Sequence, residues 1–220
     1  MFLNKIFSYW EGEKPDYIKL CQKSLILNCY KDFEINILDE NQSLIDLTPV
    51  KDLPINLKVD WLKANLIHNY GGFWIDADMI VMQSLKPLIK DIEKGFCGIP
   101  GFFGAPPVDK MLEEWIEEMD KVLGCELTFS SLIQPLLKNT GFKEFEPWTK
   151  EMICPIYHTG DEFNRFFDKF ETLEKYVTNN CFVVTLYNSS FNNDFKRLSQ
   201  RQIMDESWLI SKMFNKAIDL

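Results

Sequence analysis

The first third of the chain alternates short apolar segments with longer segments of helical periodicity. Residues 4–10 (NKIFSYW) are aromatic or β-branched at most positions and end at a glutamate–glycine pair, which predicts a strand. Residues 16–27 follow a Pro-Asp start signal and repeat apolar side chains at helical spacing, which predicts a helix with one buried face. Residues 33–38 (FEINIL) alternate apolar and polar positions and predict a second strand. This order is typical of a parallel α/β sheet.

The pattern continues around a pair of glycines. Residues 57–69 predict a helix that ends at Gly71-Gly72, because glycine readily adopts the positive φ of a helix C-terminus. Residues 73–76 then predict a short central strand. Further along the chain we predict helices at 108–123, 162–176 and 207–217, and a strand at 181–187. No repeat, Gly/Ser linker or low-complexity tract marks a boundary, so we expect a single α/β domain over residues 1–220.

Composition narrows the possible functions. With 46% hydrophobic and 14% aromatic residues, the chain has enough apolar material for a packed core. A net charge of -9 argues against nucleic acid as a partner, because such binding needs clustered Lys and Arg. An acidic protein can still bind a nucleotide diphosphate when a divalent cation lies between its carboxylates and the phosphates.

The cysteines and the start of the chain suggest a location in the cell. Six cysteines are scattered without a CxxC pair or a neighbouring histidine cluster, so we interpret them as reduced core residues and expect no zinc site. The N-terminal residues lack the features of a signal peptide, and no segment has the roughly 18 apolar residues of a membrane span. We therefore expect a cytoplasmic protein without a membrane span.

The most informative motif is an Asp-x-Asp directly after the predicted central strand. In YGGFWIDAD, Asp76 and Asp78 are spaced i, i+2, so an extended chain places both carboxylates on the same side. Open α/β sheets bind ligands beyond the carboxyl ends of their strands, where two carboxylates can bind one hard cation. Mg²⁺ or Mn²⁺ held by this pair would neutralise the charge that develops on a departing nucleotide diphosphate. Such a pair on its own is weak evidence, because it also occurs by chance in loops.

Asp60 and Lys63 lie three residues apart on the preceding predicted helix and project from neighbouring points of one face. One interpretation is an exposed ion pair worth less than about 1 kcal/mol. The other is functional: a carboxylate and a cation beside a metal at the strand end could hold a sugar hydroxyl and a phosphate.

Three segments together resemble a known family. KIFSYWEGEKPDYIKLCQKSL, FEINILDEN and VDWLKANLIHNYGGFWIDADMIV are similar to the capsular polysaccharide synthesis family of glycosyltransferases, related to the group with a DXD-type sugar-binding region. The resemblance covers roughly the first 110 residues, and their ordered combination is more specific than any single motif. It recurs more faintly in TLYNSS (185–190) and DESWLISKMF (205–214).

The resemblance implies a GT-A fold, a single Rossmann-like nucleotide-sugar-binding domain with a mixed, mainly parallel central sheet. The nucleotide-binding part would span about 1–110, and the acceptor-side and C-terminal closing part about 111–220. The expected activity is metal-dependent transfer of a hexose or deoxyhexose from a nucleotide diphosphate sugar to a glycan or glycoconjugate acceptor. A UDP-sugar is the first guess for the donor, and Mn²⁺ or Mg²⁺ is the expected cofactor.

The resemblance also implies roles for individual residues. Asp76 and Asp78 would be the DXD pair. Asp60 would match the family's helix Asp, and Lys63 the basic residue three positions further on. Trp10 would lie where the base docks, and Asp39 would lie near the nucleoside. Tyr9, Gly72 and Trp74 complete the expected donor-binding residues of this part. Two positions depart from the family. Lys63 stands where relatives usually have Arg, which replaces a bidentate fork with a point charge, and Thr185 occupies what is often a His.

In such enzymes a C-terminal segment often closes over the donor, and Asp205-Glu206-Ser207-Trp208 is suited to that role. Asp205 would complete the metal shell, Ser207 and Trp208 would contact the donor, and Asp205 or Glu206 is a candidate base if the reaction inverts. Equally, Trp208 could be a core anchor and Asp205 the N-terminal cap of the last helix.

Three alternatives stay open. Phe102, Phe103 and Gly104 could line an acceptor cleft, because aromatic rings stack on sugar faces, although a plain turn explains the run nearly as well. A haloacid dehalogenase-like phosphohydrolase would use Asp76 as its nucleophile, but its motif normally belongs to the first strand. A non-catalytic nucleotide-sugar-binding module would hold the same metal without turnover.

Overall fold

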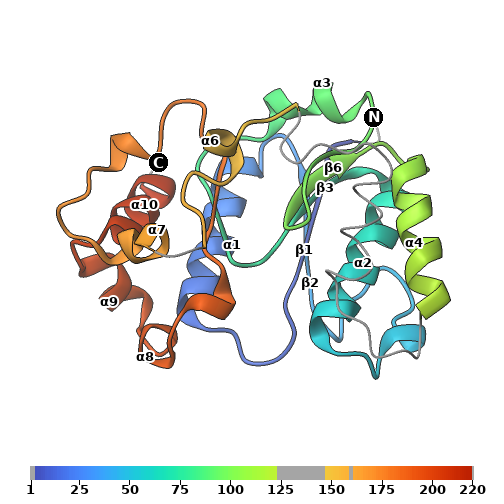
Figure 1. Cartoon of the computed structure of the whole chain (residues 1–220), viewed down its shortest axis with the longest axis horizontal. Helices are drawn as coiled ribbons and strands as arrows, with labels where there is room; N and C mark the ends of the chain where they lie inside the picture. Colours follow the sequence, from blue (N-terminus) through green and yellow to red (C-terminus); the bar gives the residue numbers. More distant parts are fainter. Residues whose placement is uncertain (1–2, 123–146, 159–160, 220) are drawn as a thin grey trace. The chain divides into compact units, whose positions relative to one another are not determined.

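The computed structural model describes residues 3–122, 147–158 and 161–219 (Figure 1). Contacts divide the chain into two compact units. The first comprises Met1–Glu11, Asn36–Ile75 and Leu88–Pro147, and the second comprises Gly12–Ile35, Asp76–Pro87 and Trp148–Leu220.

A five-stranded sheet in the order β2-β1-β3-β6-β5 organises the first unit. Its strands are β1 (Lys5–Tyr9), β2 (Glu34–Leu38), β3 (Gly72–Ile75), β5 (Cys97–Ile99) and β6 (Phe102–Ala105). β1 pairs in parallel with β3, with Ile6 opposite Phe73, whereas β6 is antiparallel to both β3 and β5. The sheet is therefore mixed, as expected. β1 and β3 are parallel, and the pairings on the other side of β3 are antiparallel.

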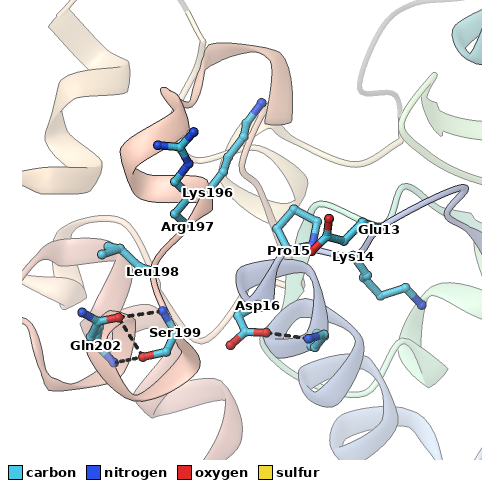
Figure 2. Close-up of a pocket in the computed structure, with 10 residues that line it drawn as sticks. Glu13, Lys14, Pro15, Asp16, Lys196, Arg197, Leu198, Ser199 and Gln202 are labelled. Carbon is cyan, nitrogen blue, oxygen red and sulfur yellow. Dashed lines mark hydrogen bonds and ion pairs between the residues drawn. The ribbon is translucent and has the colours of Figure 1, made fainter.

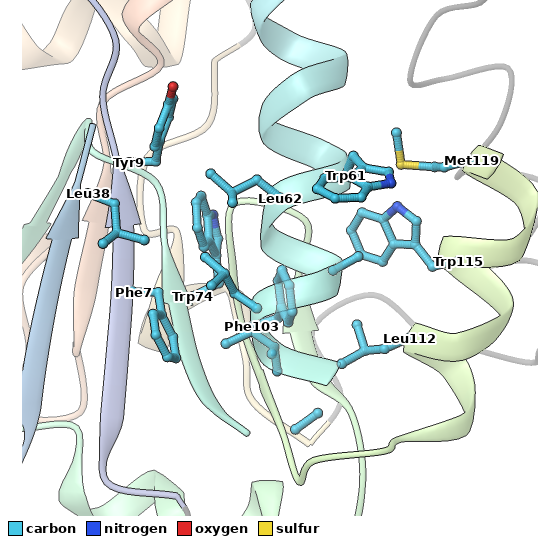
Figure 3. Close-up of a cluster of buried hydrophobic side chains, with 14 of the residues drawn as sticks. Phe7, Tyr9, Leu38, Trp61, Leu62, Trp74, Phe103, Leu112, Trp115 and Met119 are labelled. Carbon is cyan, nitrogen blue, oxygen red and sulfur yellow. The ribbon is translucent and has the colours of Figure 1, made fainter. Parts of the chain in front are cut away.

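Two long helices and the sheet enclose an aromatic core in this unit. α2 (Ile55–Tyr70) packs against α4 (Lys110–Val122), and a short helix, α3 (Ile89–Ile92), precedes β5. Figure 3 shows Trp61 of α2 beside Trp115 of α4, with Trp74 of β3 and Phe103 of β6 in the same cluster. Every residue of β3 is buried, as expected for an interior strand. α2 ends at Gly71, whose φ of 66° confirms the predicted glycine stop.

In the second unit, α1 packs against a two-stranded antiparallel sheet of β4 and β7 and against α10. The elements of this unit are α1 (Asp16–Cys29), β4 (Met79–Val81), α6 (Lys150–Ile153), α7 (Asp161–Asn164), β7 (Val183–Thr185), α8 (Asn193–Lys196), α9 (Gln200–Asp205) and α10 (Leu209–Ile218). The Asn28 side chain donates to the carbonyl oxygens of Ser24, Val81 and Ala217, and so joins α1 to β4 and α10.

Ser24 closes the edge of β4 that faces away from β7. Its hydroxyl donates to the Cys21 carbonyl at 2.7 Å and accepts from the Val81 amide at 2.9 Å, and the residue is fully buried. Ser24→Ala would leave the Val81 N–H without a partner, so we expect a loss of about 1–3 kcal/mol in the free energy of unfolding. Urea denaturation measures this loss. Ser189→Ala, at an exposed position, is the control and should change stability by less than about 0.5 kcal/mol; equal losses in the two variants would contradict the assignment.

The helix predicted over residues 162–176 is wrong. α7 and one 3-10 turn at Arg165–Phe167 are followed by an extended residue, Asp168, and a second short turn at Leu173–Lys175. The Asp168 carboxylate accepts from the Phe170 amide at 2.8 Å, so this side chain supplies a local alternative to helical hydrogen bonds. The aromatic side chains have helical spacing because Phe163 and Phe167 lie on one face of a single turn. Both rings pack against Phe191 and against each other.

The other predicted elements are largely confirmed. The strand expected at 181–187 is shorter, at Val183–Thr185, and the last helix begins at Leu209 instead of Ser207. The free cysteines in the described part are all buried, as expected, while Cys125 lies outside the described residues. Within the described ranges, no helix combines the length and apolar character needed to cross a membrane.

Candidate functional site

The Asp-x-Asp motif forms the connection between β3 and β4. Asp76 directly follows the last residue of β3, and Asp78 directly precedes the first residue of β4. Both aspartates are partly exposed, whereas Ala77 between them is buried. The motif thus presents two carboxylates from a short backbone segment that a buried strand holds at each end.

A distant segment fixes the position of Asp78. β7 pairs with β4 so that Thr185 lies opposite Met79, and the Leu186 amide then donates to the Asp78 carbonyl at 2.9 Å. Two residues later, the Asn188 amide donates to the Asp78 carboxylate at 2.6 Å. Backbone donors therefore hold both the main chain and the side chain of Asp78, which leaves little freedom in its orientation.

The Asp78 carboxyl group sits in an unfavourable electrostatic environment. Part of the residue reaches the surface, but protein atoms surround the carboxyl group, and this burial raises its pKa from 3.8 to about 6. The negative charge of Asp76 raises the pKa further, while the hydrogen bond from Asn188 and the positive charge of Lys196 lower it. The two carboxylates repel each other, so a cation bound between them would relieve a cost already present in the fold.

The residues that hold this motif were not predicted from the sequence. The Tyr17 hydroxyl donates to the Asn188 side-chain oxygen. Tyr187 adopts a left-handed conformation with φ of 57°, and its hydroxyl shares a 2.6 Å hydrogen bond with the Cys154 thiol. For this segment the sequence predicts a strand at 181–187 and shows a faint resemblance at TLYNSS, in which Thr185 departs from the His of the family. Neither signal indicates the amide of Asn188. Backbone donors leave no mark on residue type, so sequence alone could not identify them.

In the first unit, Asp60 and Lys63 form a buried ion pair on α2. The exposed fractions of the residues are only 6% and 4%, which excludes the interpretation as an exposed surface pair. The Lys63 ammonium also lies 5.7 Å from the centre of the Trp115 ring, close enough for a cation–π interaction. A buried charged pair is costly unless its geometry is favourable, so its presence is more easily explained by a role in orientation or binding than by stability.

A second charged group lies at the end of β1. Tyr9 donates its hydroxyl proton to Glu11 at 2.8 Å, and the nearly buried Lys58 pairs with Glu11 at 2.9 Å. Hydrogen bonds from Lys58 and Tyr9 hold the pKa of Glu11 below its usual range. The sequence reasoning singled out Tyr9 but missed Glu11 and Lys58.

The other predicted donor-binding residues of this unit have different surroundings. Trp10 is partly exposed, and its amide donates to the Leu38 carbonyl, which connects the ends of β1 and β2. Asp39 accepts from the amides of Asn41 and Gln42 at 2.8 and 2.9 Å, and so forms a tight turn after β2. Gly72 lets β3 approach β1, because a Cβ atom here would lie 2.3 Å from the Lys5 carbonyl oxygen.

Three aromatic residues with predicted ligand contacts have fully buried side chains. They are Trp74, predicted to contact the donor, and Phe102 and Phe103, predicted to contact the acceptor. Gly104, the third predicted acceptor residue, is also a packing position, because a Cβ atom there would lie 2.9 Å from the Gly72 carbonyl oxygen. The run GFFGAPP thus contains strand β6 instead of a plain turn or an exposed cleft.

The C-terminal candidates lie around the junction of α9 and α10. Asp205 is exposed at the end of α9 and pairs with Arg201, while Glu206 pairs with Lys169 at 3.5 Å. Ser207 is exposed. The partly exposed Trp208 is the N-cap residue of α10, and its ring contacts Phe167 edge to face. Asp205 is therefore not the cap of the last helix, and Trp208 has the packing contacts of an anchor.

The donor set around Asp78 suits a hard divalent cation. Both carboxylates supply oxygen, the ligand that such cations prefer, and their mutual repulsion disfavours the two charges when no cation is bound. The Thr185 hydroxyl, opposite Met79 in the pairing of β4 with β7, is buried without a hydrogen-bond partner within the described residues, and no contact places it at the two carboxylates. No three His, Cys, Asp or Glu residues of the described part form a metal-binding group, so this structure does not bring Asp205 to the pair. Mg²⁺ in nucleotide sites is often bound by only one or two carboxylates together with substrate phosphates, so the two aspartates fit that mode of binding.

Comparison with known proteins identifies the fold. The sequence matches no protein-family model and no curated protein. Among solved structures, the galactosyltransferase LgtC in complex with donor and acceptor sugar analogues shares 13% identity, with a TM-score of 0.51 over 98% of this chain and 96% of that one. The apo form of the glycosyltransferase GlyE from Streptococcus pneumoniae TIGR4 shares 12% identity, with a TM-score of 0.49 over 98% of this chain and 64% of that one. The likeness to LgtC shows a GT-A-like α/β fold, as the sequence predicted, and does not favour a phosphohydrolase.

Proposed function

We propose that this chain is a metal-dependent glycosyltransferase that moves a hexose or deoxyhexose from a nucleotide diphosphate sugar, with a UDP-sugar as first candidate, to a glycan or glycoconjugate acceptor. The observation that carries the proposal is the Asp-x-Asp connection after an interior strand of a GT-A-like fold, with the Asp78 carboxylate held by the Asn188 amide. This position, beyond the carboxyl end of β3, is where open α/β sheets bind ligands.

In this proposal Asp76 and Asp78 hold Mn²⁺ or Mg²⁺. When bound, the cation supplies Lewis-acid stabilisation of the charge on the departing diphosphate. The Asn188 amide keeps the Asp78 carboxylate in one orientation, and Tyr17 restrains the Asn188 side chain from α1. Such a prearranged oxygen donor set does not have to reorganise when the donor binds.

Donor recognition in this proposal involves residues of the first unit. Tyr9 and Trp10 at the end of β1 offer rings for the base, and Asp39 offers a carboxylate for the nucleoside. Asp60 is proposed to contact a sugar hydroxyl, with Lys63 as its buried counter-ion. In the second unit, Ser207 and Trp208 are proposed to cover the donor, and Asp205 or Glu206 to serve as base if the reaction inverts.

A nucleotide-sugar screen tests this function. Purified chain is incubated with UDP-, GDP- and TDP-hexoses in the presence of Mn²⁺, Mg²⁺ or a chelator, and released nucleotide diphosphate is measured with and without added glycans. We expect release from one donor class that stops with chelator and returns when Mn²⁺ is restored, because the carboxylate pair alone cannot neutralise the leaving group.

The same screen separates the proposal from its rivals. A non-catalytic module would show a metal-dependent thermal shift with a nucleotide sugar but no released nucleotide. A phosphohydrolase would release inorganic phosphate from simple phosphate esters. Either of these results, or release unchanged by chelator, would contradict the proposed function.

A further inference from the structure

A cavity of about 490 Å³ lies in the second unit, apart from the Asp-x-Asp connection (Figure 2). One wall consists of residues 13–16 and Lys19 at the start of α1, and the other of residues 196–199 and Gln202, from the end of α8 into α9. Its volume lies within the range of roughly 300–1,000 Å³ that is usual for small-molecule sites. The cavity is therefore large enough for a sugar that carries a small charged group.

The walls of this cavity are basic, although the chain as a whole carries a net charge of -9. They include four cationic and two acidic side chains. One of the acids, Asp16, is already engaged, because Lys19 pairs with it at 2.6 Å and the Gln200 amide donates to it at 3.1 Å. These contacts hold the pKa of Asp16 below its usual range, so it stays ionised as the counter-ion of Lys19.

Lys196 and Arg197 remain as cations without a carboxylate counter-ion in hydrogen-bond range among the described residues. Lys196 is partly buried, so its charge has lost some of its hydration without gaining an ion pair. Lys14 donates to the neutral amide oxygen of Gln22, which leaves its positive charge uncancelled in that contact. Figure 2 shows the Lys196 and Arg197 side chains extending from the α8 wall, across from Pro15 at the start of α1.

Hydrogen bonds link the cavity wall to the candidate active site. Tyr17, which follows Asp16 of the wall, donates to the Asn188 side chain, and the Asn188 amide donates to the Asp78 carboxylate. The donor diphosphate would be bound through the cation at Asp76 and Asp78. The cavity cations are therefore left for a second anion.

We propose that this cavity binds an anionic group, a phosphate or a carboxylate, carried by the acceptor glycan, with Lys196 and Arg197 as its counter-ions. This inference rests on the proposed function and names the class of its acceptor. A charged acceptor would be recognised by the two charge-assisted contacts, whereas a neutral sugar of the same size would leave both cations unpaired.

Binding of defined probes without donor or metal tests the proposal. Glucose 6-phosphate, glucuronate and glucose are titrated into the isotope-labelled chain, and the amide signals of residues around 13–16 and 196–199 are followed by NMR. We expect the two anionic probes to shift these signals and glucose to leave them unchanged. The Lys196→Gln/Arg197→Gln variant should bind the anionic probes about tenfold more weakly or worse, because both charge-assisted contacts are lost.

A variant with the same change in net charge is the control. Lys23→Gln/Lys31→Gln removes two exposed charges of α1 and the turn after it, outside the cavity, and should keep wild-type affinity for the probes. Equal weakening in both variants, or equal binding of glucose, would overturn the proposal. Displacement of glucose 6-phosphate from these residues by UDP with Mn²⁺ would also overturn it, because the cavity would then belong to the donor. The titration contains no donor. Binding of the anionic probes would therefore support this proposal even if the chain showed no transferase activity.

Discussion

Asp78→Asn is expected to lower metal-dependent nucleotide release by roughly 10²–10³-fold while the chain stays folded. The substitution removes one of two carboxylates available to the cation but keeps an oxygen that can accept from the Asn188 amide. The local structure should therefore survive. The loss of activity should appear as weaker binding of the metal and as a lower kcat. Activity measured over a range of Mn²⁺ concentrations separates these two contributions.

The same variant should be more stable than wild type in the presence of chelator. Burial raises the pKa of Asp78 from 3.8 to about 6 in the folded chain, so folding favours the protonated form. The stability of wild type should fall as pH rises from about 4 to about 6, and the asparagine variant should lack this component. At pH 7.5 we expect the free energy of unfolding of the variant to exceed that of wild type by roughly 1–2 kcal/mol. At pH 4 the two free energies should be almost equal.

Asp52→Asn is the matched control, because this aspartate is exposed and lies outside the proposed site. It should change neither activity nor the pH dependence of unfolding. An Asp78→Asn chain with wild-type activity would remove the main support for the metal site. A variant that is less stable than wild type at pH 7.5 would show that the carboxylate stabilises the fold, contrary to the proposed electrostatic strain.

Gly72→Ala is expected to destabilise the first unit by more than about 3 kcal/mol. Gly72 has a φ of 102°, and an added Cβ atom would meet the Lys5 carbonyl oxygen at 2.3 Å and its carbonyl carbon at 3.1 Å. These contacts are to the backbone of β1, so no side-chain rotation can relieve them. The strands would have to separate where Ile6 lies opposite Phe73, and urea denaturation or thermal unfolding would report the loss.

Gly12→Ala separates the cost of positive φ from the cost of the close approach. Gly12 also has a positive φ, at 81°, but a Cβ atom there would meet nothing within 4 Å. This variant should cost only about 1 kcal/mol, the price of the left-handed backbone alone. If Gly72→Ala costs no more than Gly12→Ala, the close approach of β1 and β3 is incorrect.

Local signals explain which parts of the fold could be predicted. The α1 and α2 segments each combine helical periodicity with a clear start or stop, and the glycine stop after Tyr70 also locates β3. β4 and β5 were not predicted, and β6 was missed because the glycines of residues 101–107 indicate a turn. Gly104 instead serves the close packing of β6 on β3, which no local pattern reveals.

The site was predictable only in part, and for a similar reason. Asp76 and Asp78 are neighbours in sequence, so their shared placement follows from strand geometry. The Asn188 amide lies 110 residues from Asp78, and only the pairing of β4 with β7 brings it there. Likewise, the burial of Asp60 and Lys63 depends on α4 packing over α2, and an isolated helix pattern cannot predict this.

The most direct test of the account is the location of manganese in a crystal of the chain soaked with UDP and Mn²⁺. We predict an anomalous peak within roughly 2.0–2.6 Å of carboxylate oxygens of Asp76 or Asp78, with diphosphate oxygens in the same coordination shell. Manganese bound elsewhere, or UDP bound with both carboxylates turned away from it, would contradict the central claim that these two aspartates hold the catalytic cation.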